Sequence, residues 1–108
     1  MTETGNFGAE RPMSERARWR LPEGVRLVWR AWDDEFVVFN TLSGQTHLLD
    51  GVSAAILDAL ERGPATVDEL SRRLAERFDL AIDEALRSRI TTICGRFDNL
   101  GLADPDSP

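Results

Sequence analysis

The chain has 108 residues, 42% of them hydrophobic, which suits a single domain with a modest core. Its formal net charge of −6 argues against nucleic acid as a main partner, because phosphate binding draws on clustered cations. A single cysteine, Cys94, excludes an intrachain disulfide and a cysteine metal cluster.

The chain opens on a polar stretch without a sustained hydrophobic period, which predicts a mobile N-terminal tail over residues 1–18. Trp19 and Leu21 break that pattern, and we expect them to dock on a domain that extends over residues 19–103. The sequence contains neither a signal peptide nor a transmembrane run, so we expect a cytoplasmic protein without a membrane partner.

Three strands are predicted next, at Val25–Trp32, Glu35–Asn40 and Gln45–Leu49, because β-branched and aromatic residues gather there. Asp33-Asp34 forms the first reversal and Thr41–Gly44 the second. These loops predict an antiparallel sheet of three strands.

The loop lengths also predict which side chains share a face of that sheet. One face carries Trp29, Ala31, Phe36, Val38, His47 and Leu49. The other face carries Val28, Val37, Phe39 and Leu48. Both faces are partly apolar, so we expect the helices to cover the first and the Trp19–Leu21 segment to cover the second.

Three helices follow, over about 52–62, 66–78 and 83–100. Asp50 is placed to cap the first, and Thr66 with Glu69 forms a capping box for the second. Gly101 ends the third, and a short acidic tail is expected over 104–108. The predicted fold is α+β: a three-stranded antiparallel sheet followed by three helices, winged-helix-like in arrangement.

Several segments of the sequence resemble a known family. The similar segments are Phe36–Asn40, Leu48–Asp50, Ser53–Leu57 and Thr66–Leu70, in that order. Together they resemble the PqqD-like peptide chaperones, also called precursor-peptide recognition elements, and within them the branch called HPr-rel-A. The resemblance covers about Trp19 to Leu102.

The resemblance implies a non-catalytic adaptor that binds a precursor (leader) peptide and presents it to a peptide-modifying or kinase-related enzyme, as in the biosynthesis of ribosomally made, modified peptides. Family members bind the peptide against the third strand and third helix. Here that strand, Gln45–Leu49, carries no Pro and no charge, so it lacks the usual protection of an edge. An extended peptide can pair with such an edge.

On the third helix the spacing predicts an apolar ridge of Ile90, Ile93 and Phe97. One flank of this ridge carries Arg89 and Arg96, and the other carries Arg87 and Cys94. Either flank can hold a peptide carboxylate, and the spacing does not choose between them. The expected peptide-binding residues are Gln45, Thr46, His47, Leu48, Leu49, Arg87, Arg89, Ile90, Ile93, Cys94, Arg96 and Phe97.

Candidate catalytic groups are few. His47, the only histidine, lacks the basic surround of a phosphoacceptor, and we interpret it as a packed strand residue. Cys94 reads as a buried, inert thiol, and Asp33-Asp34-Glu35 as a solvated turn rather than a metal site. We therefore expect no enzyme activity, no metal and no cofactor.

Two alternatives stay open. The pair of helices over 66–78 and 83–100 can imitate a helix-turn-helix, which makes a winged-helix DNA-binding protein the second hypothesis. Against it, Arg87, Arg89 and Arg96 are balanced by nearby acidic residues, so no basic stripe results. The third hypothesis is a structural dimerisation module, in which a homodimer covers the second apolar face of the sheet.

Overall fold

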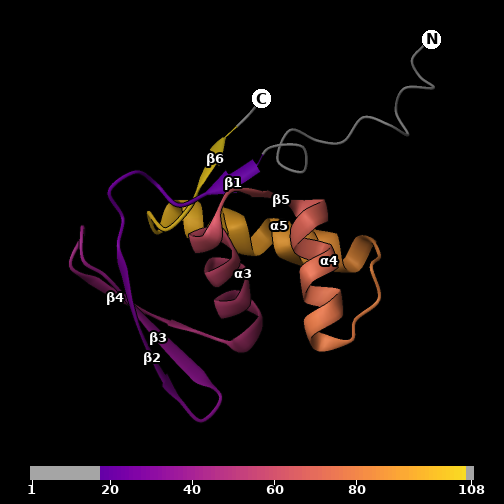
Figure 1. Ribbon diagram of the computed structural model, residues 1–108, viewed down its shortest axis with the longest axis horizontal. Helices are drawn as coiled ribbons and strands as arrows, with labels where there is room; N and C mark the ends of the chain where they lie inside the picture. Colours follow the sequence, from indigo (N-terminus) through magenta and orange to yellow (C-terminus); the bar gives the residue numbers. More distant parts are fainter. Residues whose placement is uncertain (1–17, 107–108) are drawn as a thin grey trace.

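A computed structural model describes residues 18–106. The predicted tail over 1–18 lies outside these residues, apart from Arg18. Strands β2 (Leu27–Trp32), β3 (Glu35–Asn40) and β4 (Gln45–Leu49) form an antiparallel sheet in the order β2-β3-β4 (Figure 1). The predicted three-stranded sheet is confirmed.

The register of this sheet follows from its two short loops. Asp33 adopts a left-handed φ of 49° in the two-residue reversal, a conformation that a short polar side chain tolerates. In the four-residue loop, Gly44 supplies a φ of 79°, and Leu42 donates its N–H to the side-chain oxygen of Asn40 at 2.9 Å. Trp29 therefore lies opposite Val38, which lies opposite His47, as the loop lengths predict.

Three helices follow the sheet: α3 (Gly51–Arg62), α4 (Val67–Phe78) and α5 (Glu84–Asn99). Asp50 caps α3 by accepting the N–H of Ser53 at 2.8 Å, and the predicted capping box of α4 is present. The chain leaves α5 through a left-handed Gly101, and Leu102 donates to the carbonyl of Phe97 at 2.8 Å. None of the helices within residues 18–106 has the length and apolarity needed to cross a bilayer.

A second small sheet, which sequence analysis did not predict, joins the two ends of the described chain. Its strands are β1 (Arg18–Arg20), β5 (Ala65–Thr66) and β6 (Asp104–Asp106), in the order β5-β1-β6. Residues 104–106, expected to be a tail, thus pair with β1, and Arg18 lies 3.6 Å from the carboxylate of Asp106. The expected tail is part of the domain as far as Asp106.

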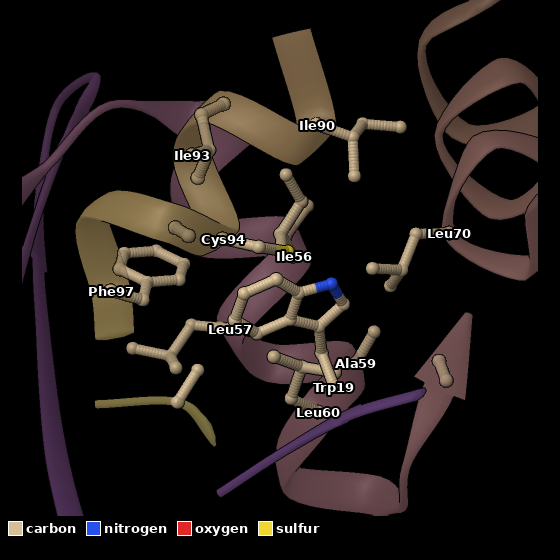
Figure 2. Close-up of a cluster of buried hydrophobic side chains, with 14 of the residues drawn as sticks. Trp19, Ile56, Leu57, Ala59, Leu60, Leu70, Ile90, Ile93, Cys94 and Phe97 are labelled. Carbon is tan, nitrogen blue, oxygen red and sulfur yellow. The ribbon is translucent and has the colours of Figure 1, made fainter. Parts of the chain in front are cut away.

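Trp19 occupies the helical core rather than the open face of the β2-β3-β4 sheet. Its indole lies among side chains of α3, α4 and α5, next to Ile56, Leu57 and Leu70, and is only 4% exposed (Figure 2). The expectation that the Trp19–Leu21 segment covers the second sheet face is wrong. The reason is physical: β1 is held between β5 and β6 at the helical end of the molecule, away from that sheet (Figure 1).

The second face of the β2-β3-β4 sheet consequently stays open. Val28, Phe39 and Leu48 on this face are 46%, 39% and 64% exposed. The first face packs on α3 instead, where Val38 is fully buried and Leu49 nearly so. The described residues thus cover only one face of this sheet.

Candidate functional site

The candidate site is the free edge of strand β4. Among residues 18–106, in the sheet order β2-β3-β4, this strand has a partner on one side only. The N–H of Thr41 donates to the carbonyl of Arg26 at 2.9 Å, and the β2–β3 register places these two residues opposite each other. Hydrogen-bonded pairs alternate along an antiparallel ladder. The odd-numbered residues of β3 therefore bond to β2, and its even-numbered residues bond to β4.

This alternation shows which backbone groups of β4 are unpaired within the sheet. Val38 and Phe36 of β3 are even-numbered, and they lie opposite His47 and Leu49. The backbone groups of His47 and Leu49 thus point to β3, whereas those of Thr46 and Leu48 point to the open edge. An added strand would find its hydrogen-bond partners at these two residues.

A groove runs between β4 and the C-terminal half of α5. It contains a cavity of about 340 Å³. Its lining residues are Thr46, His47, Leu48, Leu49, Asp50, Ser53, Arg96, Phe97 and Leu100. We call this the β4–α5 groove. It combines an unpaired strand edge, apolar side chains and one guanidinium.

A second cavity, of about 470 Å³, continues the groove along α5 and is lined by Arg89, Ile93 and Arg96 together with Asp50 and Ser53. The N–H of Ser53 lowers the pKa of Asp50 below its usual value, and the positive charges of Arg89 and Arg96 act in the same direction. Two arginines and one carboxylate thus share this part of the site.

The structure distinguishes the two arginine flanks of α5. Arg87 lies on the α4 side, where its Nε donates to a carboxylate oxygen of Asp68 at 3.0 Å. Arg96 lines the groove, and Arg89 lines its continuation along α5. The bidentate geometry of arginine suits a carboxylate, so this is the flank that can meet an acidic peptide side chain.

Several expected site residues do not face the groove. Ile90 and Cys94 are fully buried in the core, and burial raises the pKa of the Cys94 thiol to about 12, which makes it unreactive. Gln45 is exposed, pairs with Asn40 and lines neither cavity. Ile93 and Phe97 are buried, yet each still contributes to a cavity wall.

His47 lies on the helix-facing side of the sheet, opposite Val38, and is half-buried. Its Nε2 is buried and makes no hydrogen bond to any described residue. Within residues 18–106 no cluster of His, Cys, Asp and Glu is arranged to hold a metal ion. The position of His47 agrees with the interpretation of a packed strand residue at the wall of the groove.

Sequence reasoning missed three residues that line the β4–α5 groove: Asp50, Ser53 and Leu100. It recognised Asp50 only as a helix cap. The sequence held a signal for Asp50, because a helix cap that directly follows an edge strand must lie at the end of that edge. Leu100 follows the last turn of α5, and its exposure depends on the Gly101 turn.

We expect the cap at Asp50 to give stability that depends on pH. Its folded-state pKa is lowered, so its contribution is full above the unfolded value, near 4, and is lost as the pH falls through the folded value. Asn caps a helix about as well but does not titrate. As the pH falls from 6 to 3, the melting temperature of wild type should therefore fall relative to that of Asp50→Asn. A constant difference over this range would contradict the assignment.

Comparison with known proteins gives the family. A family model described as coenzyme PQQ synthesis protein D (PqqD) matches residues 35–102. A comparison with curated proteins gave no match. Two solved structures are similar in fold. TbiB1, solved in complex with the TbiA(beta) leader peptide, is 20% identical with a TM-score of 0.62 over 79% of this chain and 94% of TbiB1.

The second is the PqqD truncation of Methylobacterium extorquens PqqCD, described as a functional, stand-alone RiPP recognition element. It is 22% identical with a TM-score of 0.58, over 81% of this chain and 88% of that one.

The fold and the open edge beside α5 define a small α+β domain with an unpaired strand next to a helix. The family match covers more than half of the chain, and the chain belongs to the PqqD family.

Proposed function

We propose that this protein binds a precursor (leader) peptide as an added strand on β4 and presents it to a modifying enzyme. The observation that carries the proposal is the unpaired backbone of Thr46 and Leu48 at a free strand edge beside a groove. An extended peptide supplies the complementary N–H and C=O groups. Membership of the PqqD family and the fold shared with a leader-peptide complex support the same function.

The groove chemistry indicates what kind of peptide fits. Alternate side chains of an added strand point to the helix side, where Phe97 and Leu100 offer apolar contact. Arg96 lines the same cavity, Arg89 lies nearer the N-terminus of α5, and both suit an Asp or Glu of the peptide. The proposed ligand is therefore an extended peptide with an apolar residue and an acidic residue.

The proposed role is non-catalytic. The thiol of Cys94 is buried and its pKa is raised to about 12, and the Nε2 of His47 is also buried. Chemistry on the peptide would then belong to a partner enzyme, and this domain would supply affinity and orientation. Holding the peptide close to that enzyme raises its effective concentration there.

The proposal is tested by an amide-shift titration with candidate leader peptides encoded near the gene. We expect shifts in residues 45–50 together with residues on the groove side of α5. Arg96→Gln should weaken binding about threefold to tenfold, the range for one partly exposed charge-assisted contact.

Arg87→Gln is the matched control, because Arg87 lies on the same helix but pairs with Asp68. It should leave peptide affinity unchanged, at a small cost in thermal stability. Shifts confined to α4 or to the Asp33–Glu35 turn would contradict binding at the β4 edge.

A further inference from the structure

A second groove lies on the other side of α3. One cavity of about 340 Å³ is bounded by Trp29 and Phe36 of the sheet and by Ala54 and Ala55 of α3. A smaller cavity of about 130 Å³ shares Ala55 with it and continues between α3 and α4. We call the two together the α3–α4 groove. The larger cavity is lined by the two aromatic side chains of the sheet and by small side chains of α3.

The groove is separate from the β4–α5 groove, and the two have no lining residue in common. Helical residues advance by about 100° each. Ala55, Asp58 and Arg62 therefore lie on one side of α3, and Ser53, which lines the β4–α5 groove, lies on the opposite side. Two ligands can occupy the two grooves at the same time.

The rim of the α3–α4 groove is basic in a chain of net charge −6. Its lining residues include Arg30, Arg62, Arg73 and Arg77 and one carboxylate, Asp58, and a second carboxylate, that of Glu61, lies beside it on the indole N–H of Trp29. Asp58 pairs with Arg62 at 3.2 Å. Within residues 18–106, no ion pair engages the other three arginines. The rim is complementary to an acidic ligand.

The aromatic wall is held in place. The indole N–H of Trp29 donates to the carboxylate of Glu61 at 2.8 Å, which ties β2 to α3. By the same alternation that governs β4, the backbone groups of Trp29 and Ala31 point to the free edge of β2. An extended segment lying along this edge would find both backbone partners and an apolar cavity.

We propose that the α3–α4 groove is a docking site for a partner protein, which inserts an extended acidic segment with one aromatic side chain. The aromatic ring fills the cavity between Trp29, Phe36 and Ala55, where aromatic contact and apolar burial favour it. The flanking carboxylates meet Arg73 and Arg77. This goes beyond leader-peptide binding and does not depend on it.

The test uses a short fluorescein-labelled peptide in which one Trp is flanked by Asp and Glu residues. We expect it to bind the full chain, with amide shifts in residues 29–31, 54–62 and 73–77. The same peptide with Asn and Gln in place of the acids, or with Ala in place of Trp, should bind more weakly. Arg73→Gln/Arg77→Gln should weaken binding at least about fivefold, since each exposed charge pair contributes modestly.

Arg72→Gln is the matched control, because Arg72 is an exposed arginine of the same helix that does not line the groove. It should bind the probe like wild type, and so should Leu48→Pro, which alters the other groove. The proposal is overturned if wild type does not bind the probe, if the double variant binds it equally, or if the shifts fall on β4 and α5. Tighter, Arg73- and Arg77-dependent binding of random duplex DNA would overturn it as well.

Discussion

Replacing Trp19 with Ala should lower the free energy of unfolding by about 3–5 kcal/mol, the range for truncating a large buried aromatic side chain. Trp19 is 4% exposed and packs among residues of α3, α4 and α5 (Figure 2). Removal of the indole leaves a cavity between three helices, and their movement cannot fill it completely. Domains of this size have a total free energy of unfolding of only about 5–15 kcal/mol, so this residue accounts for a large share of it.

Urea denaturation followed by circular dichroism measures the effect, with Trp32→Ala as the matched control. Trp32 is 58% exposed on the open face of the sheet, so the same substitution there should change stability by less than about 1 kcal/mol. Equal midpoints for the two variants would show that β1 does not anchor the core. A variant that lacks residues 1–21 should behave like Trp19→Ala.

Trp19 also shows where sequence reasoning stops. Alternation and loop length predicted the strands, their register and the side chains on each face, because these depend on residues close together in the chain. The β5-β1-β6 sheet instead pairs Trp19 with Ala65 and with Pro105. Strands of two or three residues carry no periodic signal, and nothing local indicates a partner so distant. The apolar open face of the other sheet was a competing place for the indole.

The helices were predicted well for the opposite reason. The signals are local: the Asp50 cap, the Thr66–Glu69 capping box and the left-handed Gly101 all lie within a few residues of the end that they define. Their packing against each other was not local. The 3.6-residue period placed Ile90 and Phe97 on one apolar face of α5, but it could not place Arg87 beside Asp68, a residue of another helix.

The candidate site likewise has features that local sequence signals predict and features that they do not. Strand Gln45–Leu49 could be predicted as an edge from its composition. The choice of the Arg89 and Arg96 flank could not, because it requires the rotation of α5 about its own axis. That rotation is set by Leu86, Ile90 and Phe97, which pack on the other helices and turn Arg96 to β4.

Leu48→Pro should abolish most leader-peptide binding while leaving the domain folded. The backbone N–H of Leu48 points away from β3, so proline removes a donor that no strand of the sheet uses. The loss of one hydrogen bond and the clash of the ring with an added strand should weaken binding at least about tenfold. Isothermal calorimetry with the leader peptide found by titration measures it, and circular dichroism checks the fold.

Two matched variants separate the backbone from the side chain. Leu48→Ala keeps the donor, and the Leu48 side chain is 64% exposed, so this change should reduce binding far less than proline does. His47→Pro removes an N–H that bonds to β3 and should destabilise the sheet itself, which would appear as a lower melting temperature. If Leu48→Pro folds and binds like wild type, the peptide does not add to β4. If Leu48→Ala loses as much affinity as Leu48→Pro, side-chain contact rather than strand pairing holds the peptide.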